Sequence, residues 1–215
     1  QAAYWDNALP GKSAQQAAVL HVLKDELDVL DGFHTIGVMM DMEKFYDLMK
    51  PLELIRAARA QKFPKRTFVI ALLFHYSPKN LRAHGCYAQA AYPYTSICAG
   101  CRHGHDFTKL YFFEVIKDMY ATYPEYPIKT YFDDVTLRAT NASKKVLVIG
   151  TIVATARLAS SLKGIGCSLA TKSAVVASAR ELGVEVAKGL RALQIKINYT
   201  RETKYLGVGV TGGGR

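Results

Sequence analysis

The sequence predicts an α+β fold in which a largely antiparallel sheet is backed by helices on one face. Several segments place apolar residues at helical spacing, and short apolar runs typical of strands alternate with them. Some of the neighbouring strand-like runs are joined by turns too short to hold a crossover helix. With 215 residues, of which 50% are hydrophobic and 21% charged, the chain has a globular composition and enough length for a sizeable core.

The first half of the chain alternates helical and strand patterns. Ser13 is a plausible N-cap for the first helix, and Pro51 suits the first turn of a later one. In residues 64–76 the β-branched and aromatic content leaves both helix and strand open. The elements expected here are helices at 14–30, 51–61 and 64–76, and strands at 35–41 and 80–88.

The second half contains the clearest hairpin signal. Strand-like runs at 128–132 and 135–140 flank Asp133 and Asp134, which would stand at the tip of a hairpin. The other elements expected here are helices at 106–123, 143–166 and 179–193, a pair of short strands within 168–178, and closing strands at 195–200 and 204–210.

The charge balance favours anionic partners. The net charge is +10 and the isoelectric point is about 9.4, which favours nucleic acid because neutralised phosphates release counterions. A merely basic soluble protein is the alternative. Four cysteines predict no disulfide framework, so a reducing intracellular compartment is expected, nuclear or cytoplasmic. The longest apolar run, from Lys145, is judged too short to span a bilayer, so no membrane partner is expected.

Three carboxylates stand at strand ends. Asp133 and Asp134 lie between apolar strand runs, and Asp41 follows the apolar strand at 35–41. An ordinary solvated turn is the alternative interpretation of the first two. If the two strand ends are neighbours, however, the three carboxylates surround one point and suit magnesium, which binds through carboxylates and substrate phosphates. Because the chain is basic and has no P-loop, this cluster points to phosphoryl transfer on polymerised nucleotides.

An ordered series of motifs resembles the reverse transcriptase family. "DMEKFYD" (41–47) and "YFDD" (131–134) are similar to its two metal-binding motifs, and 92 residues separate Asp41 from Asp133. Four further stretches fall in the family's order: one before the two motifs, one between them and two after them. These are "AGCRHGHDFTK" (99–109), "LATKSAVV" (169–176), "TKYLGVGV" (203–210) and "LPGKSAQQAAVLHVL" (9–23). The chain most resembles the polymerase segment of a non-LTR retrotransposon.

The resemblance implies a polymerase palm, with a ferredoxin-like antiparallel sheet, and part of the fingers. Residues 1–35 and 50–95 would belong to the fingers, 36–49 and 96–200 to the palm, and 201–215 to a primer-grip hairpin. The early fingers and a thumb are expected to lie outside this single domain. No feature indicates an oligomeric state, the element type or the host.

The implied activity is that of an RNA-directed DNA polymerase, a nucleotidyltransferase within the transferases. It would extend the 3′-OH of a DNA primer on an RNA template with deoxynucleotides, using two magnesium ions or, as the alternative, manganese. Asp41, Asp133 and Asp134 would hold the metals, and Lys172 would act as the general acid for the departing pyrophosphate.

The remaining roles implied by the resemblance concern nucleotide and nucleic acid. Tyr46 would be the steric gate that excludes a ribose 2′-OH, and the His103-Gly104 pair stands where the family has Gln-Gly. The backbone of Met42 and Phe45 would lie near the incoming triphosphate. Lys12 would contact template or triphosphate, and Tyr205, Leu206 and Gly207 would support the primer end. Ordinary alternatives are a core aromatic for Tyr46, a solvated lysine for Lys172 and simple packing for the Tyr205 group.

Two other interpretations stay open for the function. An RNA-directed RNA polymerase is disfavoured by Tyr46, since ribonucleotides need room for the 2′-OH. A non-catalytic nucleic-acid-binding scaffold or a decayed copy is kept open by His103 and by the missing Pro-Leu-Ser after Gly104.

A zinc site is the remaining possibility that the residue types raise. Cys98, Cys101, His103 and His105 are zinc-ligand types, but no loop separates them into two pairs that could close a tetrahedron. No zinc is therefore expected, and Cys98 is interpreted as a small buried residue.

Overall fold

The chain has an α+β fold, as the sequence predicts. The structure, a computed structural model, describes residues 4–8, 11, 13–98 and 100–213. Its helices are α1 (Ala14–Leu30), α2 (Phe45–Leu48), α3 (Pro51–Ala60), α4 (Lys65–Tyr76), α5 (Gly104–Thr122), α6 (Lys144–Gly164) and α7 (Arg180–Ala192). Its strands are β1 (His34–Met40), β2 (Arg82–Ala83), β3 (Cys86–Tyr87), β4 (Ile128–Tyr131), β5 (Asp134–Asn141), β6 (Ala174–Ala177), β7 (Asn198–Tyr199), β8 (Thr203–Tyr205) and β9 (Val208–Val210).

The central sheet has five strands in the order β4-β5-β1-β6-β7. Its first four strands pair antiparallel, but β7 pairs parallel to β6, so the expectation of an antiparallel sheet is wrong at this edge. The reason is the connection: α7 carries the chain back along the sheet, so the next strand starts at the same end as β6.

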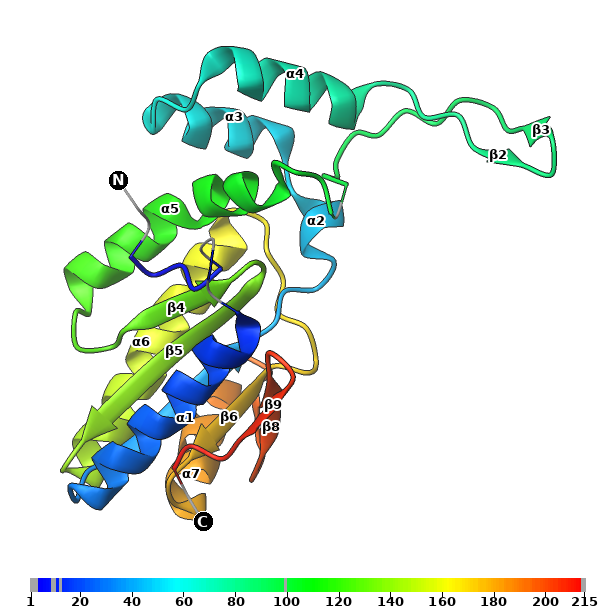
Figure 1. Cartoon of the computed structure of the whole chain (residues 1–215). Coiled ribbons are helices and arrows are strands. Elements are labelled where there is room, and N and C mark those ends of the chain that lie inside the picture. Colours follow the sequence, from blue (N-terminus) through cyan, green and yellow to red (C-terminus); the bar gives the residue numbers. More distant parts are fainter. Residues whose placement is uncertain (1–3, 9–10, 12, 99, 214–215) are drawn as a thin grey trace.

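Helices cover both faces of the sheet, although the sequence predicts only one covered face. The helices α5, α6 and α7 form one layer, and α1 crosses the other face beside the β8–β9 hairpin (Figure 1). The face against α5–α7 carries the large core, which includes Ile36, Val38 and Met40. A smaller cluster on the α1 face unites Met39 with Ala18, Val176, Tyr205 and Val210. Because the alternating residues of β1 enter both clusters, this strand is the centre of the fold.

Helix α1 is held to the sheet by a cap and by charges. Ser13 and Gln16 form a capping box at its start, which confirms the predicted N-cap. From β5, the Arg138 guanidinium bonds Asp25 Oδ1 at 2.6 Å and also pairs with Asp28. Asp25 and Arg138 are both buried, so this pairing compensates for burial of their charges.

The segment from α3 to β3 stands away from the sheet (Figure 1). Residues 65–76 form helix α4, which settles the helix–strand ambiguity, and Pro64 is its N-cap residue. The expected strand at 80–88 is a hairpin of two two-residue strands, β2 and β3. The division of the chain into fingers, palm and primer grip stays a prediction.

Helix α6 is the longest of the described helices and is largely apolar. By these two criteria alone its 21 residues could cross a membrane. In this structure α6 packs against α5, α7 and the sheet, and Leu147, Ala154 and Leu158 are fully buried.

Candidate metal and nucleotide site

Sheet register brings the two predicted strand ends together. Met40 pairs with Val135 across β1 and β5, so Asp41 lies beside the β4–β5 turn made by Phe132 and Asp133. Arg138, four residues after Asp134, reaches α1, and Met39, two residues before Asp41, packs on α1. By strand alternation, Asp41 and Asp134 therefore belong to the same face of the sheet.

The three carboxylates interact electrostatically. Burial, then the charges of Asp133 and Asp41, raise the pKa of Asp134 to about 6. Burial and the charge of Asp41 likewise raise the pKa of Asp133, while Lys172 opposes the shift. Like charges held this close favour protonation or a bound cation.

A lysine stands next to this cluster. Lys172 Nζ lies 2.8 Å from Asp41 Oδ1, and this hydrogen bond raises the pKa of Lys172. The lysine side chain is 74% exposed, so it can move away from Asp41 without disturbing the core. Across residues 4–8, 11, 13–98 and 100–213, no three His, Cys, Asp or Glu side chains form a ready-made metal cage. The carboxylate oxygens nevertheless fit magnesium, which needs only one or two such ligands beside water and phosphate.

The loop at 168–173 fixes the backbone at Asp41. The Asp41 N–H donates to Ser173 Oγ at 3.1 Å, and the Ala170 N–H donates to the Asp41 carbonyl at 2.8 Å. Glu43 N–H donates to the Ser168 carbonyl at 2.7 Å. This loop replaces the first of the two strands expected within 168–178, because its backbone bonds go to residues 41–43 instead of a regular ladder. Sequence reasoning missed Ser173, since only tertiary structure reveals its partner.

The β4–β5 turn has a strained backbone, and residues of α5 and of the N-terminal segment pack beneath it. Phe132 has φ = 54°, a left-handed conformation that is unfavourable for a bulky residue. Its ring packs at 4.8 Å (between centroids) against His105, whose Nε2 lies 2.9 Å from Asp6 Oδ2. Lys109 Nζ is also 2.9 Å from that oxygen. The sequence offered no signal for this support, which joins the N-terminal segment, α5 and the turn.

The predicted gate residue lies beside the predicted His-Gly pair. Tyr46 is half-buried, and a Cβ added to Gly104 would lie 3.8 Å from its ring. The charge of Asp133 contributes to the raised pKa of Tyr46, after burial, so Tyr46 and the carboxylates are neighbours. His103 Nδ1 lies 3.5 Å from Asp106 Oδ2 at the start of α5. Met42 and Phe45 are buried core residues, which leaves only their backbone for a nucleotide.

The predicted primer-grip residues form the β8–β9 turn. Leu206 (φ = 50°) and Gly207 (φ = 83°) make a two-residue turn with both φ angles positive. Tyr205 is buried, with its ring centroid 5.6 Å from that of His21. Burial raises the pKa of Tyr205, and the Asp134 charge adds to this, so the hairpin lies near the carboxylates. Lys12 lies outside the described residues.

The cysteine prediction needs one correction. Cys98 is exposed, whereas the preceding Ile97 occupies the buried position in this loop. The two histidines of the zinc-like stretch pair instead with Asp106 and Asp6.

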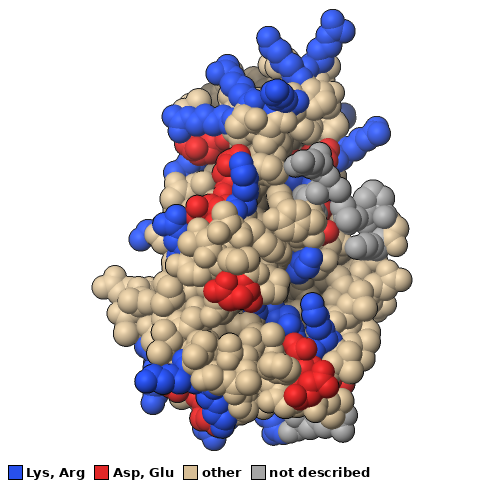
Figure 2. Space-filling view, turned by 90° about the vertical axis from the view of Figure 1, so that its left-hand side faces the viewer, with Lys and Arg blue, Asp and Glu red and all other residues tan. Residues whose placement is uncertain are grey.

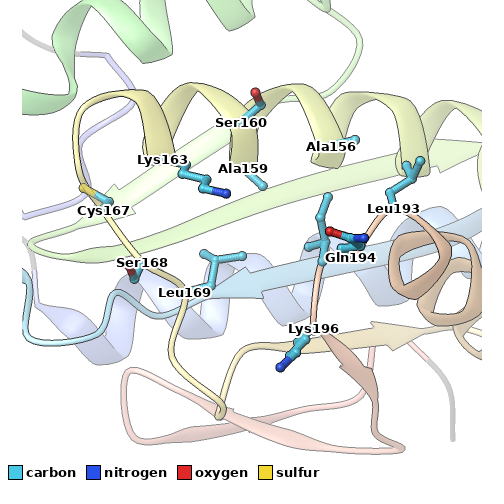
Figure 3. A pocket seen from close by; sticks show the side chains of 11 residues that line it. Ala156, Ala159, Ser160, Lys163, Cys167, Ser168, Leu169, Leu193, Gln194 and Lys196 are labelled. Carbon is cyan, nitrogen blue, oxygen red and sulfur yellow. The ribbon is translucent and has the colours of Figure 1, made fainter.

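A hollow of about 490 Å³ lies on the helical side, between the end of α6 and the segment after α7. Figure 3 shows its walls, with Lys163 and Ser160 on α6, Leu169 after it, and Gln194 opposite. Asp41, Asp133 and Asp134 do not line it, so it is distinct from the carboxylate site.

A scan against protein-family models gives no match for the chain, and a search of curated proteins gives none either. The interpretation of the site therefore rests on the residues and their geometry.

Proposed function

We propose that the chain is the core of an RNA-directed DNA polymerase of the reverse transcriptase type. The observation that carries this proposal is that Asp41 lies near Asp133 and Asp134, although about 90 residues separate it from them in the sequence. The same site lies beside Tyr46 and Gly104. The strand and helix order β1-α5-β4-β5-α6-β6 supports a ferredoxin-like palm, with α3 and α4 as part of the fingers.

Each residue then has a defined task. Asp41, Asp133 and Asp134 would hold two magnesium ions, which would supply charge stabilisation for an attacking primer oxygen and a departing pyrophosphate. Ser173 would keep Asp41 in place through its backbone, and the strained turn at Phe132 would aim Asp133. Tyr46 would exclude the 2′-OH of a ribonucleotide. Lys172, already protonated beside Asp41, would stand ready to donate a proton.

The decisive experiment is extension of a DNA primer on an RNA template with magnesium and deoxynucleotides. The Asp133→Asn, Asp134→Asn variant should abolish extension, whereas Asp118→Asn should not, because Asp118 pairs with Arg157 on the surface. Binding of Mn²⁺, followed by electron paramagnetic resonance, gives a readout independent of turnover. Unchanged Mn²⁺ binding in the double variant would contradict the assignment of the site.

The same assay separates the two alternative functions. Incorporation of ribonucleotides by the unaltered chain would favour an RNA-directed RNA polymerase, and Tyr46→Val should admit them only if Tyr46 is the gate. Absence of extension together with Mn²⁺ binding and template binding would favour the non-catalytic scaffold. The Lys172–Asp41 ion pair is the observation that favours this scaffold, since it neutralises one carboxylate without any metal.

A further inference from the structure

The positive charge of the chain is concentrated in one segment. Residues 54–105 hold eight Lys or Arg and no Asp or Glu, so this segment carries eight of the ten net positive charges. Figure 2 shows Lys and Arg side chains gathered at the top of the molecule, over α3 and α4. The cations are Arg56, Arg59, Lys62, Lys65, Arg66, Lys79, Arg82 and Arg102. A cluster of one sign is the electrostatic footprint of a polyanion-binding surface.

The most prominent part of this segment is residues 77–96, called the arm below. Figure 1 shows that it projects from the end of α4, with β2 and β3 at its tip. Paired backbone bonds between Lys79 and Ala91, at 2.8 and 2.9 Å, join its two sides. His84 and Gly85 close the tip with positive φ angles of 49° and 82°. The arm is thus a regular hairpin that stands clear of the core.

Large flat side chains are exposed along the arm. Tyr87 is 70% exposed, Tyr92 63% and Tyr94 86%. Cations are interleaved with them: the Arg82 guanidinium lies 5.3 Å from the centre of the Tyr87 ring, and Lys79 lies 4.5 Å from that of Phe74. Aromatic platforms combined with cations are the means by which proteins bind single-stranded nucleic acid, through base stacking and phosphate attraction.

The base of the arm is attached to the candidate site. The Ile97 N–H, which follows the arm directly, donates to the Tyr46 carbonyl at 2.7 Å. The next N–H, of Cys98, donates to His75 Nδ1 at 3.1 Å. A strand bound along the arm would therefore lie on the side of the site where Tyr46 and Gly104 meet.

We infer that the arm binds single-stranded RNA, with bases stacked on Tyr87, Tyr92 and Tyr94 and phosphates held by Lys79 and Arg82. The inference deepens the proposed function and rests on it for one point, that the bound strand is the template. The binding itself requires no metal and no catalysis.

The test is fluorescence anisotropy with a labelled oligouridylate of about 20 nucleotides in EDTA, at salt concentrations from about 50 to 200 mM. The Tyr87→Ala, Tyr92→Ala, Tyr94→Ala variant should weaken binding about a thousandfold, since each of the three stacked bases contributes roughly tenfold. The matched control is Leu20→Ala, Leu23→Ala, Leu27→Ala, which removes exposed apolar side chains from α1 and should leave the affinity unchanged. Lys79→Ala with Arg82→Ala should lower the salt slope by about 2.

The outcomes separate this inference from the proposed function. Unchanged RNA affinity in the tyrosine variant, with its fold intact by circular dichroism, would overturn the arm proposal. So would a change in sedimentation with unchanged RNA affinity, which would assign the arm to a second copy of the chain. The Asp133→Asn, Asp134→Asn variant should keep full RNA affinity in EDTA. If the tyrosine variant loses RNA binding and the unaltered chain never extends a primer, the arm proposal is supported and only the polymerase proposal is refuted.

Discussion

The carboxylate site and the arm carry opposite charges, and different contacts hold them in place. The three aspartates are partly buried at the end of a sheet, and hydrogen bonds with Ser173 and Ala170 fix the backbone of Asp41. The arm is basic, exposed and held mainly by its own backbone pairs. The difference teaches that a chain of net charge +10 can keep a negative site, because most of its excess positive charge lies elsewhere, in residues 54–105. Stability and charge can therefore be altered separately in the two regions.

The largest effect on folding should come from Arg138, on the sheet side of this comparison. Arg138→Met leaves Asp25 buried without its partner, which should lower the free energy of unfolding by about 3–5 kcal/mol in urea titrations. Replacing both residues, Arg138→Met with Asp25→Leu, should recover most of the loss. A single variant as stable as the unaltered chain would show that the ion pair contributes nothing.

The next effect concerns the support beneath the turn. Burial alone would raise the pKa of Asp6, but hydrogen bonds from His105, Lys109 and the Ala8 N–H lower it overall. A carboxyl with a lowered folded pKa stabilises the protein above its unfolded pKa of about 3.9 and loses this contribution as pH falls further. Asp6→Asn should therefore cost about 2 kcal/mol at neutral pH. In thermal scans, the difference in melting temperature between this variant and the unaltered chain should decrease as the pH falls through about 4. A difference that does not change with pH would contradict this role of Asp6.

The third effect has the opposite sign. Because the pKa of Asp134 is raised to about 6, the folded protein is penalised above that pH and relieved of the penalty below about pH 4. Asp134→Asn should accordingly raise the free energy of unfolding at pH 8 in EDTA by about 1 kcal/mol, a value reduced for partial solvent screening. Calorimetry at pH 8 and pH 4 checks this, with a gain expected only at pH 8. Equal stability of the variant and the unaltered chain at pH 8 would mean that neither burial nor the neighbouring carboxylates penalise the charged form of Asp134.

The smallest effect should come from the arm. Tyr94→Ala removes a side chain that is 86% exposed, so the free energy of unfolding should change by less than about 0.5 kcal/mol. Urea titration of this variant and of Arg138→Met compares directly how much a residue of the arm and a residue of the sheet contribute to the free energy of unfolding. A loss of more than about 1 kcal/mol in the free energy of unfolding would show that Tyr94 packs against the core and that the arm is not held separately from it.

Much of the site was predictable because its signals are local. An apolar strand that ends in Asp41, and two strands that flank Asp133 and Asp134, indicate strand ends from sequence alone. Their meeting required the β1–β5 register, which the structure supplies. Ser173 and the His105–Asp6 contact could not be predicted, since each depends on a partner more than 90 residues away.

The errors have a similar origin in long-range structure. The parallel edge at β7 depends on where α7 returns the chain, and the position of α1 depends on burial of Asp25 against β5. Periodicity within a segment carries information about its own faces but not about which layer it joins. Cys98 is exposed for the same reason, because its neighbour Ile97 takes the core position.

The central place of β1 affects how the protein can be made. Its two partners, β5 and β6, begin at Asp134 and Ala174, roughly 100 and 140 residues downstream of His34. At ribosomal speeds of about 5–20 residues per second, β1 spends on the order of ten seconds with both edges unpaired. The apolar strand that precedes Asp41 is therefore the segment of the nascent chain most open to mispairing, and chaperones should be needed most during that interval.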